Sequence, residues 1–424
     1  MKFFKYKKNN LYCENIRVTD ICSKMDTPFY LYSYNSIINN FYKLERLLKG
    51  VNSIIAYSVK ANSALSILKT LANCGAGADI VSIGELKKAL RSGIPNKKIV
   101  YSGVGKSKEE ISYALENDIE QFNIESLEEL IVLSKVAYEK NLDARVAVRI
   151  NPDIAAGGHP KISTGKKADK FGVSIDKAKK IYNLAKELKN IHIVGIDIHI
   201  GSQILDTTPF KNAFKKVIKF SEYLEKEGHK IINIDIGGGI GINYNSDLEN
   251  NKFVQEYIDL VKNIYKKTGK RIILEPGRFL IANCGILVTK VLYNKKTENK
   301  HFLIVDAGMN NLMRPALYNA KHLIMPLIRN SKAKLINYDV VGPICETADI
   351  LVKKAKLPKE ICEEDLLFID KVGAYGSVMA SSYNSKDLVS EILVKDEIFF
   401  EIKERIKTED LIKFEKIAPW LKKN

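Results

Sequence analysis

Short β-rich segments alternate with helix-like segments eight times within about 240 residues, and this alternation restricts the possible folds more than any other feature of the chain. The predicted strands are Ile54–Val59, Ala78–Ser82, Ile99–Ser102, Gln121–Ile124, Ala144–Ile150, Val194–Ile200, Ile231–Ile236 and Arg271–Glu275. Intervening segments such as Ser63–Asn73 and Leu127–Lys140 carry apolar residues at spacings of three and four, as amphipathic helices do. Eight such units match a closed parallel barrel better than an open sheet.

The pattern changes after Phe279, where strand-like segments follow one another without full helical crossovers. These segments are Ile286–Tyr293, Phe302–Asp306, Lys334–Val341 and Leu366–Ile369. We therefore predict an α/β fold with a (β/α)8 TIM-like barrel at residues 34–281 and a mainly β C-terminal domain at residues 282–424. The N-terminal segment 1–33, which contains Phe29-Tyr30-Leu31-Tyr32, is expected to join the β domain as an added strand.

The composition is that of a globular protein, with 46% hydrophobic and 28% charged residues among 424. The six cysteines form no Cys-x-x-Cys pair, so we predict reduced thiols, no disulfide framework and no metal site. The chain has no run of 18 apolar residues, and no apolar segment follows the charged N-terminus. These features predict a cytoplasmic protein that neither spans a membrane nor carries a secretory signal.

The net charge of +17 raises the question of nucleic-acid binding. Only ten of the 67 basic residues are arginine, and the lysines are scattered without a stripe or interleaved aromatic residues. We therefore predict no nucleic-acid partner. The charge is instead expected to attract small anions.

Chemically versatile residues follow three of the predicted barrel strands and end a fourth, and active sites of such barrels lie at the C-terminal strand ends. Lys60 directly follows the first strand. His199 lies at the end of the sixth strand, and Ser202 comes just after it. Gly237–Gly239 follow the seventh strand, and Glu275 is the last residue of the eighth. These side chains are therefore expected to meet at one end of the barrel.

Together these residues supply the parts of a pyridoxal 5′-phosphate site. A lysine amine in a partly dry pocket is a usable nucleophile, and consecutive glycines let backbone N–H groups approach a phosphate. The imidazole of His199 can stack on the cofactor, the hydroxyl of Ser202 can bind the phosphate, and a carboxylate facing the pyridine nitrogen keeps that nitrogen protonated. Taken singly, Lys60 can be a lysine that reaches to solvent, His199 a core histidine and Glu275 a partner of Arg278. Their combination favours the cofactor site.

Several motifs resemble the barrel-type (fold type III) pyridoxal-phosphate decarboxylases. These motifs are Tyr57–Asn62, Gly75–Leu86, His199–Gln203, Asp235–Ile240 and Glu275–Leu280. Within that class, a further set of motifs is similar to those of the diaminopimelate decarboxylases: His159–Gly165, Lys170–Gly172, Asp306–Asn310, Arg314–Tyr318, Gly342–Thr347 and Gly373–Gly376. The resemblance covers nearly the whole chain.

The resemblance implies how the chain holds its cofactor. Lys60 forms a Schiff base with pyridoxal 5′-phosphate, Glu275 pairs with the pyridine nitrogen, and His199 stacks on the ring. The implied phosphate contacts come from Ser202, Gly238, Gly239, the segment Glu275, Pro276, Gly277 and Arg278, and Tyr375.

The resemblance also implies a substrate site shared between two subunits of a homodimer. Arg278, Arg314 and Tyr318 resemble the clamp on the far carboxylate of the substrate, and Tyr375 borders the substrate. Cys345 and Glu346 resemble residues that the second subunit donates: Cys345 as the acid that protonates the carbanion, and Glu346 as the group that recognises the far ammonium.

The implied reaction converts meso-2,6-diaminoheptanedioate to L-lysine and carbon dioxide, the last step of lysine biosynthesis. The alternative within the same fold is a decarboxylase of ornithine, arginine or a carboxylated polyamine such as carboxynorspermidine, whose substrates lack the far amino-acid carboxylate. A racemase would need a second base opposite Lys60. A non-catalytic pyridoxal-phosphate carrier is typically a barrel alone, whereas this chain has about 140 further residues with site-like motifs.

Overall fold

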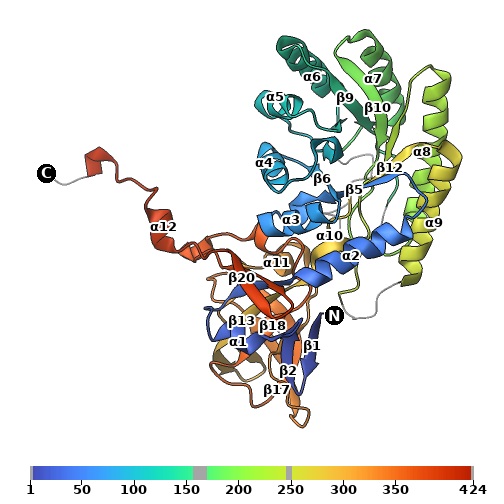
Figure 1. Ribbon diagram of the computed structural model, residues 1–424. Coiled ribbons are helices and arrows are strands. Elements are labelled where there is room, and N and C mark those ends of the chain that lie inside the picture. The colour runs from blue at the N-terminus through green and yellow to red at the C-terminus, as the bar shows by residue number, and fades with distance from the viewer. Residues whose placement is uncertain (1–2, 156–169, 245–250, 422–424) are drawn as a thin grey trace. The chain divides into compact units, whose positions relative to one another are not determined.

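The computed structural model describes residues 3–155, 170–244 and 251–421. The chain divides into two compact units (Figure 1). One unit comprises Ile37–Ala282, and the other combines Met1–Ser36 with Asn283–Asn424. We call them the barrel unit and the β unit.

The barrel unit contains a closed sheet of eight parallel strands in the order β10-β11-β12-β5-β6-β7-β8-β9. The strands are β5 (Ser53–Ser58), β6 (Gly77–Ile80), β7 (Ile99–Tyr101), β8 (Gln121–Ile124), β9 (Ala144–Arg149), β10 (Ile191–Asp197), β11 (Asn233–Asp235) and β12 (Arg271–Leu274). This sheet confirms the predicted barrel, with β5 to β12 as the counterparts of the eight predicted strands.

Helices surround the barrel strands (Figure 1). They are α2 (Tyr34–Leu47), α3 (Leu65–Asn73), α4 (Ile83–Arg91), α5 (Lys108–Glu116), α6 (Leu127–Lys140), α7 (Ile175–Glu187), α8 (Thr208–Lys226), α9 (Asn251–Thr268) and α10 (Arg278–Ile281). Four of them begin after a serine whose hydroxyl accepts a hydrogen bond from the backbone N–H three residues on: Ser82, Ser107, Ser126 and Ser174. A serine in this position satisfies an N–H group that the helix leaves unpaired and typically contributes about 1 kcal/mol.

The barrel interior is polar along part of its length. Gln121 Nε2 donates to Asn123 Oδ1 at 2.8 Å, and Asn233 Nδ2 donates to Gln121 Oε1 at 2.9 Å. Arg271 Nε donates to Asn233 Oδ1 at 2.9 Å. Because buried polar groups are costly unless they are hydrogen-bonded, this chain of amides fixes the strand register as well as filling space.

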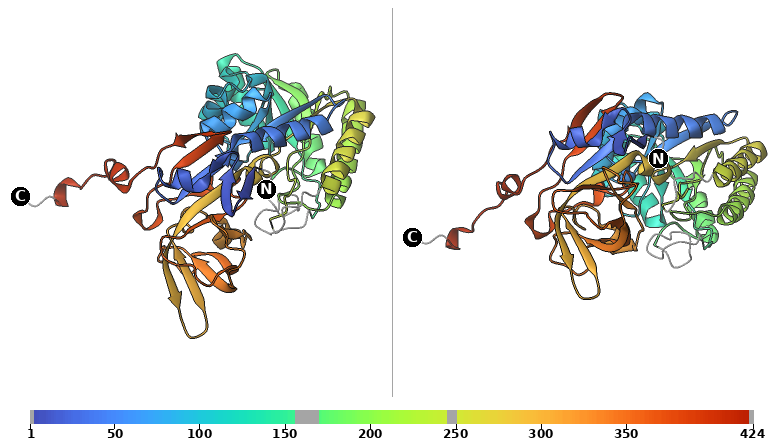
Figure 2. Two further views of the ribbon diagram at one scale, coloured as in Figure 1. Left: turned by 60° about the horizontal axis from the view of Figure 1, so that its bottom comes forward. Right: turned by 90° about the horizontal axis from the view of Figure 1, so that it is seen from below.

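The β unit is built on a nine-stranded sheet and a small three-stranded sheet (Figure 2). The larger sheet contains β4 (Phe29–Ser33), β13 (Gly285–Lys296), β14 (His301–Val305), β15 (Ile324–Pro326), β16 (Leu335–Val341), β17 (Ile350–Pro358), β18 (Leu366–Ile369), β19 (Glu391–Lys395) and β20 (Ile398–Lys403). The smaller sheet contains β1 (Phe4–Lys7), β2 (Asn10–Cys13) and β3 (Ile16–Arg17), and the helices of the unit are α1 (Val18–Cys22), α11 (Arg314–Tyr318) and α12 (Thr408–Ile412).

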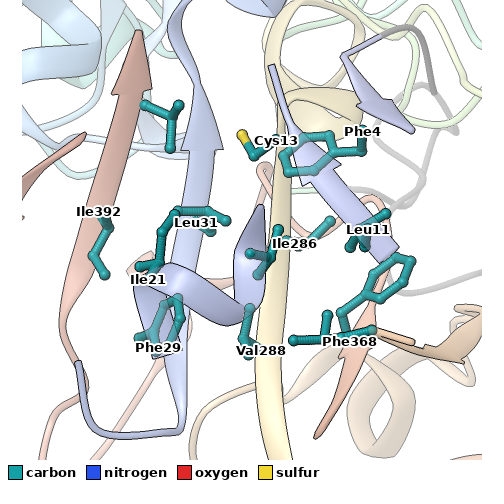
Figure 3. Packing of buried hydrophobic residues seen from close by; sticks show 13 residues of the cluster. Phe4, Leu11, Cys13, Ile21, Phe29, Leu31, Ile286, Val288, Phe368 and Ile392 are labelled. Carbon is teal, nitrogen blue, oxygen red and sulfur yellow. The ribbon is translucent and has the colours of Figure 1, made fainter. Parts of the chain in front are cut away.

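The N-terminal strand β4 lies inside the larger sheet, where it pairs antiparallel with β13 and parallel with β19. Its apolar side chains enter a core with residues from both ends of the chain, including Leu11, Phe29, Ile286 and Ile392 (Figure 3). The expectation that the first residues join the β domain is therefore confirmed.

The sixth and seventh barrel strands end earlier than predicted, because their last predicted residues no longer form regular pairs with the neighbouring strands. The segment Val194–Ile200 is replaced by β10, which runs from Ile191 to Asp197, and Ile231–Ile236 shrinks to β11. Ile198 and Ile236 each still donate one backbone hydrogen bond to a neighbouring strand, at 3.0 and 2.9 Å. The chain then turns into the loops that carry His199 and the glycines. Among the described helices, none is both long and apolar enough to cross a membrane.

Candidate active site at the barrel strand ends

The amine of Lys60 lies at the C-terminal end of β5, on the single turn Val59–Ala61. Lys60 Nζ is 2.7 Å from Asp79 Oδ2, and Ser58 Oγ donates to the same oxygen at 2.6 Å. Asp79 is fully buried, whereas 37% of the Lys60 side chain is exposed. The Lys60 amine therefore makes a charged hydrogen bond to a buried carboxylate, while more than a third of the lysine side chain remains exposed to solvent.

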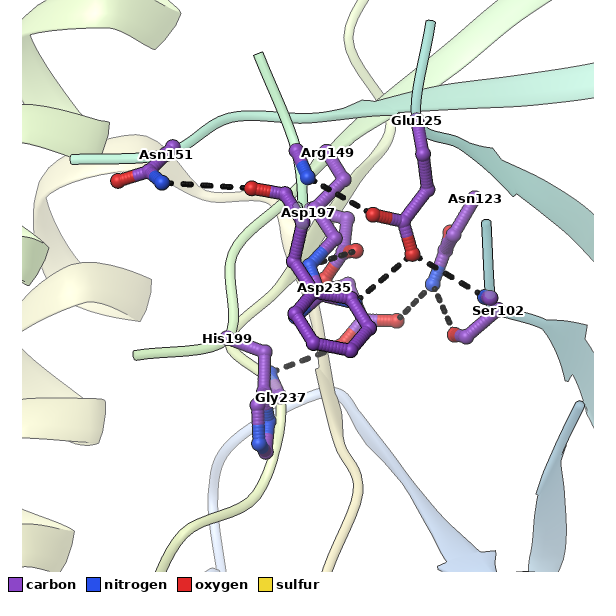
Figure 4. Close-up of polar contacts among 12 residues, drawn as sticks. Ser102, Asn123, Glu125, Arg149, Asn151, Asp197, His199, Asp235 and Gly237 are labelled. Carbon is purple, nitrogen blue, oxygen red and sulfur yellow. Dashed lines mark hydrogen bonds and ion pairs between the residues drawn. The ribbon is translucent and has the colours of Figure 1, made fainter. Parts of the chain in front are cut away.

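Glu275 follows β12 directly and is buried. Ser102 Oγ donates to its Oε1 at 3.2 Å, and Asn123 Nδ2 lies 3.5 Å from the same oxygen. Asn123 Nδ2 also lies 3.2 Å from Asp235 Oδ2 (Figure 4). Carboxylate oxygens of Asp197, Asp235 and Glu275 all lie within 4.8 Å of one another. Three acidic groups thus share one buried space at the strand ends.

This crowding shifts the acidic groups toward their protonated forms. Burial raises the pKa of Glu275 well above its ordinary value, and the carboxylates of Asp235, Asp79 and Asp197 add to the shift. Burial also raises the pKa of Asp235 to about 7. Because like charges this close cannot all ionise, the cluster retains a proton at neutral pH unless a cation is placed beside it.

One arginine partly offsets the buried negative charge. Arg149 Nη1 donates to Glu125 Oε1 at 2.9 Å, and its Nε lies 3.9 Å from Asp197 Oδ2. Among the described residues, no group donates a hydrogen bond to Asp197 Oδ1 or to Asp79 Oδ1, although both atoms are buried. The negative charge of this cluster is therefore only partly compensated by the described residues.

His199 presents a neutral, partly buried ring beside this cluster. Gly238 N donates to His199 Nδ1 at 3.1 Å, which leaves the ring proton on Nε2. His199 Nδ1 is 4.0 Å from Glu275 Oε2. Burial lowers the pKa of His199 well below its usual value, and the positive charges of Arg149 and Lys60 act in the same direction.

The glycine turn after β11 is required by the close approach of neighbouring backbones. A Cβ at Gly238 would lie 2.3 Å from the Glu275 carbonyl oxygen, and Gly237 has a φ of +64°. Gly239 has a φ of +101°, and a Cβ there would lie 2.5 Å from the Gly201 carbonyl oxygen. Side chains are therefore excluded from this turn, as a site that receives a bulky anion close to the backbone requires.

A cation and two hydroxyl groups lie next to the turn. Arg278 Nη2 donates to Ser202 Oγ at 3.2 Å, and Arg278 Nη1 donates to Tyr244 Oη at 2.7 Å. Arg278 begins α10 directly after Pro276 and Gly277, and all three residues are buried. The barrel unit thus brings together Lys60, His199, Ser202, Gly238, Gly239, Glu275, Pro276, Gly277 and Arg278.

The barrel residues fit pyridoxal phosphate. A protonated pyridine nitrogen beside Glu275 would supply the positive charge that the acidic cluster lacks, and a phosphate would face the Arg278 guanidinium and the Ser202 hydroxyl. Lys60 is the amine that could hold the cofactor aldehyde. The three carboxylates are also close enough to ligate a cation, but Glu275 then could not serve the ring nitrogen.

The remaining predicted residues belong to the β unit and are described within it. Arg314 and Tyr318 begin and end α11, where Arg314 is buried and Tyr318 partly exposed. Cys345 and Glu346 are exposed on the loop between β16 and β17. Cys345 N donates to Asn384 Oδ1 at 2.8 Å.

Tyr375 follows β18 and has a φ of +57°, a conformation that a tyrosine seldom adopts without support from its surroundings. The motif His159–Gly165 lies outside the described residues.

Several residues of the site were not among those predicted from the sequence. They are Asp79, Ser102, Asn123, Arg149, Asp197 and Asp235, all in the barrel unit. Within the β unit, His322 lies beside Arg314 and was not predicted either. In the sequence, a detectable signal is a lone polar residue inside an apolar strand, as in Ala-Asp-Ile at Asp79 and Ile-Asp-Ile at Asp235. His322 carries no comparable signal.

Comparisons with known proteins identify the family of the chain. Residues 34–282, which comprise the barrel, match the family model described as pyridoxal-dependent decarboxylase, pyridoxal binding domain. This match defines the class of the barrel and its cofactor.

Relatives that match nearly the full length of the chain identify the family within this class of decarboxylases. A diaminopimelate decarboxylase of Aquifex aeolicus is 42% identical over 93% of both chains, and one of Zymomonas mobilis is 41% identical over 99% of both. The crystal structure of diaminopimelate decarboxylase from Helicobacter pylori complexed with L-lysine has a TM-score of 0.89 at 42% identity, covering 94% of this chain and 98% of that one. The enzyme from M. jannaschii, in co-complex with L-lysine, has a TM-score of 0.92 at 36% identity, covering 99% and 98%.

The chain therefore belongs to the diaminopimelate decarboxylases, a family of pyridoxal-phosphate-dependent amino-acid decarboxylases.

Proposed function

We propose that this chain removes carbon dioxide from meso-diaminopimelate and yields L-lysine. The observation that carries the proposal is the convergence of the Lys60 amine, the neutral His199 ring and the buried Glu275 carboxyl at one end of the barrel. The substrate is inferred from relatives of this name and from two solved relatives that hold L-lysine, the expected product.

The barrel residues would hold pyridoxal phosphate in a single orientation. Lys60 would bind its aldehyde carbon, His199 would stack on its ring, and Glu275 would pair with its ring nitrogen. Its phosphate would be held by Ser202, Gly238, Gly239, the segment Pro276, Gly277 and Arg278, and Tyr375. When bound, the cofactor supplies an electron sink for the bond that breaks.

The remaining residues select and orient the substrate. Arg278, Arg314 and Tyr318 bind the far carboxylate, and Glu346 binds the far ammonium, so that both charges of the distant amino-acid end are paired. Fixing that end orients the carboxylate that leaves and excludes water from the reacting carbon. The carbon that loses carbon dioxide gains one proton, which the Cys345 thiol supplies.

We further propose that the active form is a homodimer in which Cys345 and Glu346 of one subunit complete the site of the other. Both residues are exposed on a loop of the β unit, as this role requires. Glu346 Oε2 accepts a hydrogen bond from Tyr383 Oη at 3.1 Å, which orients the carboxylate before a partner arrives. The cytoplasmic location and the lack of a nucleic-acid partner remain predictions.

The test is to incubate the purified, cofactor-loaded protein with meso-diaminopimelate and measure carbon dioxide and L-lysine. Equal amounts of both products are expected. Comparable turnover of ornithine, arginine or carboxynorspermidine would move the chain to the polyamine branch of the fold. Conversion of meso-diaminopimelate to another stereoisomer without carbon dioxide would indicate a racemase, and cofactor binding without turnover of any amino acid would indicate a carrier.

A further inference from the structure

The end of the β unit carries an unusual concentration of exposed apolar side chains. We call residues 404–421, which follow the edge strand β20, the C-terminal arm. Figures 1 and 2 show this arm leading away from the sheet of its own unit. Phe414 is 86% exposed and Trp420 is 83% exposed. The other apolar side chains that are more than half exposed on β20 and the arm are Ile398, Phe400, Ile412, Ile417 and Leu421.

Seven large apolar side chains within residues 398–421 are more than half exposed. Single exposed hydrophobic residues are ordinary, but apolar surface of more than about 300–600 Å² gathered in one region marks an interaction site. Three aromatic residues, Phe400, Phe414 and Trp420, can bury about 150–250 Å² each. With the four aliphatic residues, the total is on the order of the 800 Å² that each partner buries in a stable complex.

The start of the C-terminal arm is anchored by hydrogen bonds next to the loop that carries Cys345 and Glu346. Ile406 and Leu388 exchange backbone hydrogen bonds of 2.9 and 3.0 Å. Thr408 Oγ1 donates to the Ser385 carbonyl oxygen at 2.7 Å. Residues 383–388 therefore hold the arm on one side, and on the other they contact the Cys345 loop through Asn384 and Tyr383.

The charge of the arm is mixed, as in a segment that binds a protein surface. Residues 404–421 carry four basic residues, Arg405, Lys407, Lys413 and Lys416, and four acidic ones, Glu404, Glu409, Asp410 and Glu415, and Lys422 and Lys423 follow in the sequence. A segment that binds anionic lipid combines apolar residues with a lysine-rich face. Acidic residues stand among the lysines of this arm, so we take a protein surface as its partner and include anionic vesicles in the test.

We infer that the C-terminal arm docks its apolar side chains on a second copy of this chain. The inference rests on the proposed function, because the neighbouring Cys345 and Glu346 are proposed to reach the site of that second copy. The arm extends the same contact, and its burial strengthens the dimer in which the shared sites form.

Trp420 makes the inference directly measurable, because it is the only tryptophan of the chain. The holoenzyme is diluted stepwise, and tryptophan emission and acrylamide quenching are recorded beside sedimentation velocity. In samples that contain two-chain particles, we expect a blue-shifted emission and quenching at least threefold weaker than in single-chain samples. Both signals should change along the same dilution curve.

Substitutions test whether the apolar side chains of the arm, rather than other exposed residues, stabilise the dimer. The double variant Phe414→Ser and Ile417→Ser should shift the midpoint of dissociation to at least a tenfold higher concentration. Tyr138→Ser is the matched control, because Tyr138 is a 76% exposed residue on α6, and it should leave the midpoint unchanged. An equal midpoint in the double variant would overturn the inference.

Cross-linking identifies the surface that the arm contacts even if the dimer never dissociates. A photoreactive phenylalanine analogue replaces Phe414, and this chain is mixed with a 15N-labelled chain. Cross-linked peptides of mixed isotope composition are expected. Cross-links within one chain only, an exposed Trp420 in the two-chain particle, or a blue shift seen only with phosphatidylserine vesicles would each overturn the inference.

The same samples keep this inference separate from the proposed function. Cross-links between chains without turnover of meso-diaminopimelate would refute the function and leave the arm contact standing. Turnover with cross-links within one chain only would refute the arm contact alone.

Discussion

His322 fixes the guanidinium of Arg314 through its own ring. Arg314 Nη1 lies 2.8 Å from His322 Nε2, and His322 Nδ1 lies 2.9 Å from the Asp370 carbonyl oxygen. An arginine can only donate and a carbonyl can only accept, so His322 accepts at Nε2, donates at Nδ1 and is neutral. The adjacent Leu323 N donates to Asp370 Oδ1 at 2.9 Å, which anchors the same segment.

Replacing His322 by leucine is expected to impair substrate binding more than chemistry. Loss of the acceptor leaves Arg314 without one of its buried partners, at a cost of about 1–3 kcal/mol. The KM for meso-diaminopimelate should rise about tenfold, with a smaller change in kcat and an unchanged cofactor spectrum. His322→Gln should restore part of the loss, and the exposed His192→Leu serves as the control. A lower kcat at constant KM would contradict this role.

Arg314→Lys should lose most of its activity on meso-diaminopimelate while binding the cofactor normally. A lysine cannot reproduce the planar two-point contact between arginine and a carboxylate. An unpaired buried charge costs about 2–5 kcal/mol, so kcat/KM should fall by on the order of 10²-fold or more. Lysine, ornithine and arginine should be negligible substrates of the wild-type protein. Full activity of the variant would argue against the carboxylate clamp.

Borohydride should trap the cofactor on Lys60. Its amine is accessible at the strand ends, whereas the neighbouring barrel lysine Lys106 is buried and bound to Glu129 Oε1 at 2.7 Å. Mass spectrometry of the reduced protein should locate the adduct on Lys60 and leave Lys106 unmodified. Lys60→Ala should give no adduct. An adduct at any other lysine would exclude the assignment.

Asp235 should make the cofactor-free protein less stable as the pH rises. Burial raises the pKa of Asp235 to about 7, against about 3.9 for an unfolded aspartate. Between these values the folded state binds more protons than the unfolded state, so the free energy of unfolding falls from about pH 4 to about pH 7 and then levels off. The loss is on the order of 2–4 kcal/mol at about 1.4 kcal/mol per pKa unit.

Urea unfolding at several pH values checks this dependence. The stability of the wild-type protein relative to Asp235→Asn should decline across the window. Asp259→Asn, on the exposed face of α9, is the control and should show no such decline. Parallel pH profiles for the wild type and Asp235→Asn would contradict the prediction.

Mixed dimers should recover activity that neither parent has. Lys60→Ala removes the cofactor lysine and Cys345→Ala removes the proposed acid, so a mixed dimer contains one site without either substitution. Recovery should approach about a quarter of wild-type activity, since half of the dimers are mixed and each has one intact site. Mass spectrometry should verify that mixed dimers form. Their inactivity would mean that each subunit carries a complete site.

The barrel was predictable because most of its strands are short and largely apolar, as expected for buried parallel strands, and because amphipathic helices separate them. The strands of the β unit were harder to predict. Strand β17 reads Ile-Leu-Val-Lys-Lys-Ala-Lys-Leu-Pro, and its lysines obscure the alternation expected of a strand with one exposed face. The small sheet β1–β3 consists of strands of two to four residues, too short for a periodic signal.

For the site, sequence reasoning located groups that follow strand ends and missed those that support them. Glu275 stands next to a recognisable Pro-Gly-Arg turn, whereas Asn123 and Arg149 lie on strands and reach the site only because the barrel closes. His322 is eight residues from Arg314, and its role follows from the pairing of β15 with β18, which brings the segment before β15 to Asp370. Such contacts depend on tertiary structure.

The position of β4 between β13 and β19 has a consequence for how the chain is made. A ribosome releases β4 before the barrel, but its partners β13 and β19 follow only after residue 284 and residue 390. The barrel, encoded between them, is complete first and can fold as a unit during synthesis. The apolar strand Phe-Tyr-Leu-Tyr-Ser therefore has no native partner while the barrel is made, and its second edge stays open to chaperones and other nascent chains until β19 is synthesised near the end of the chain.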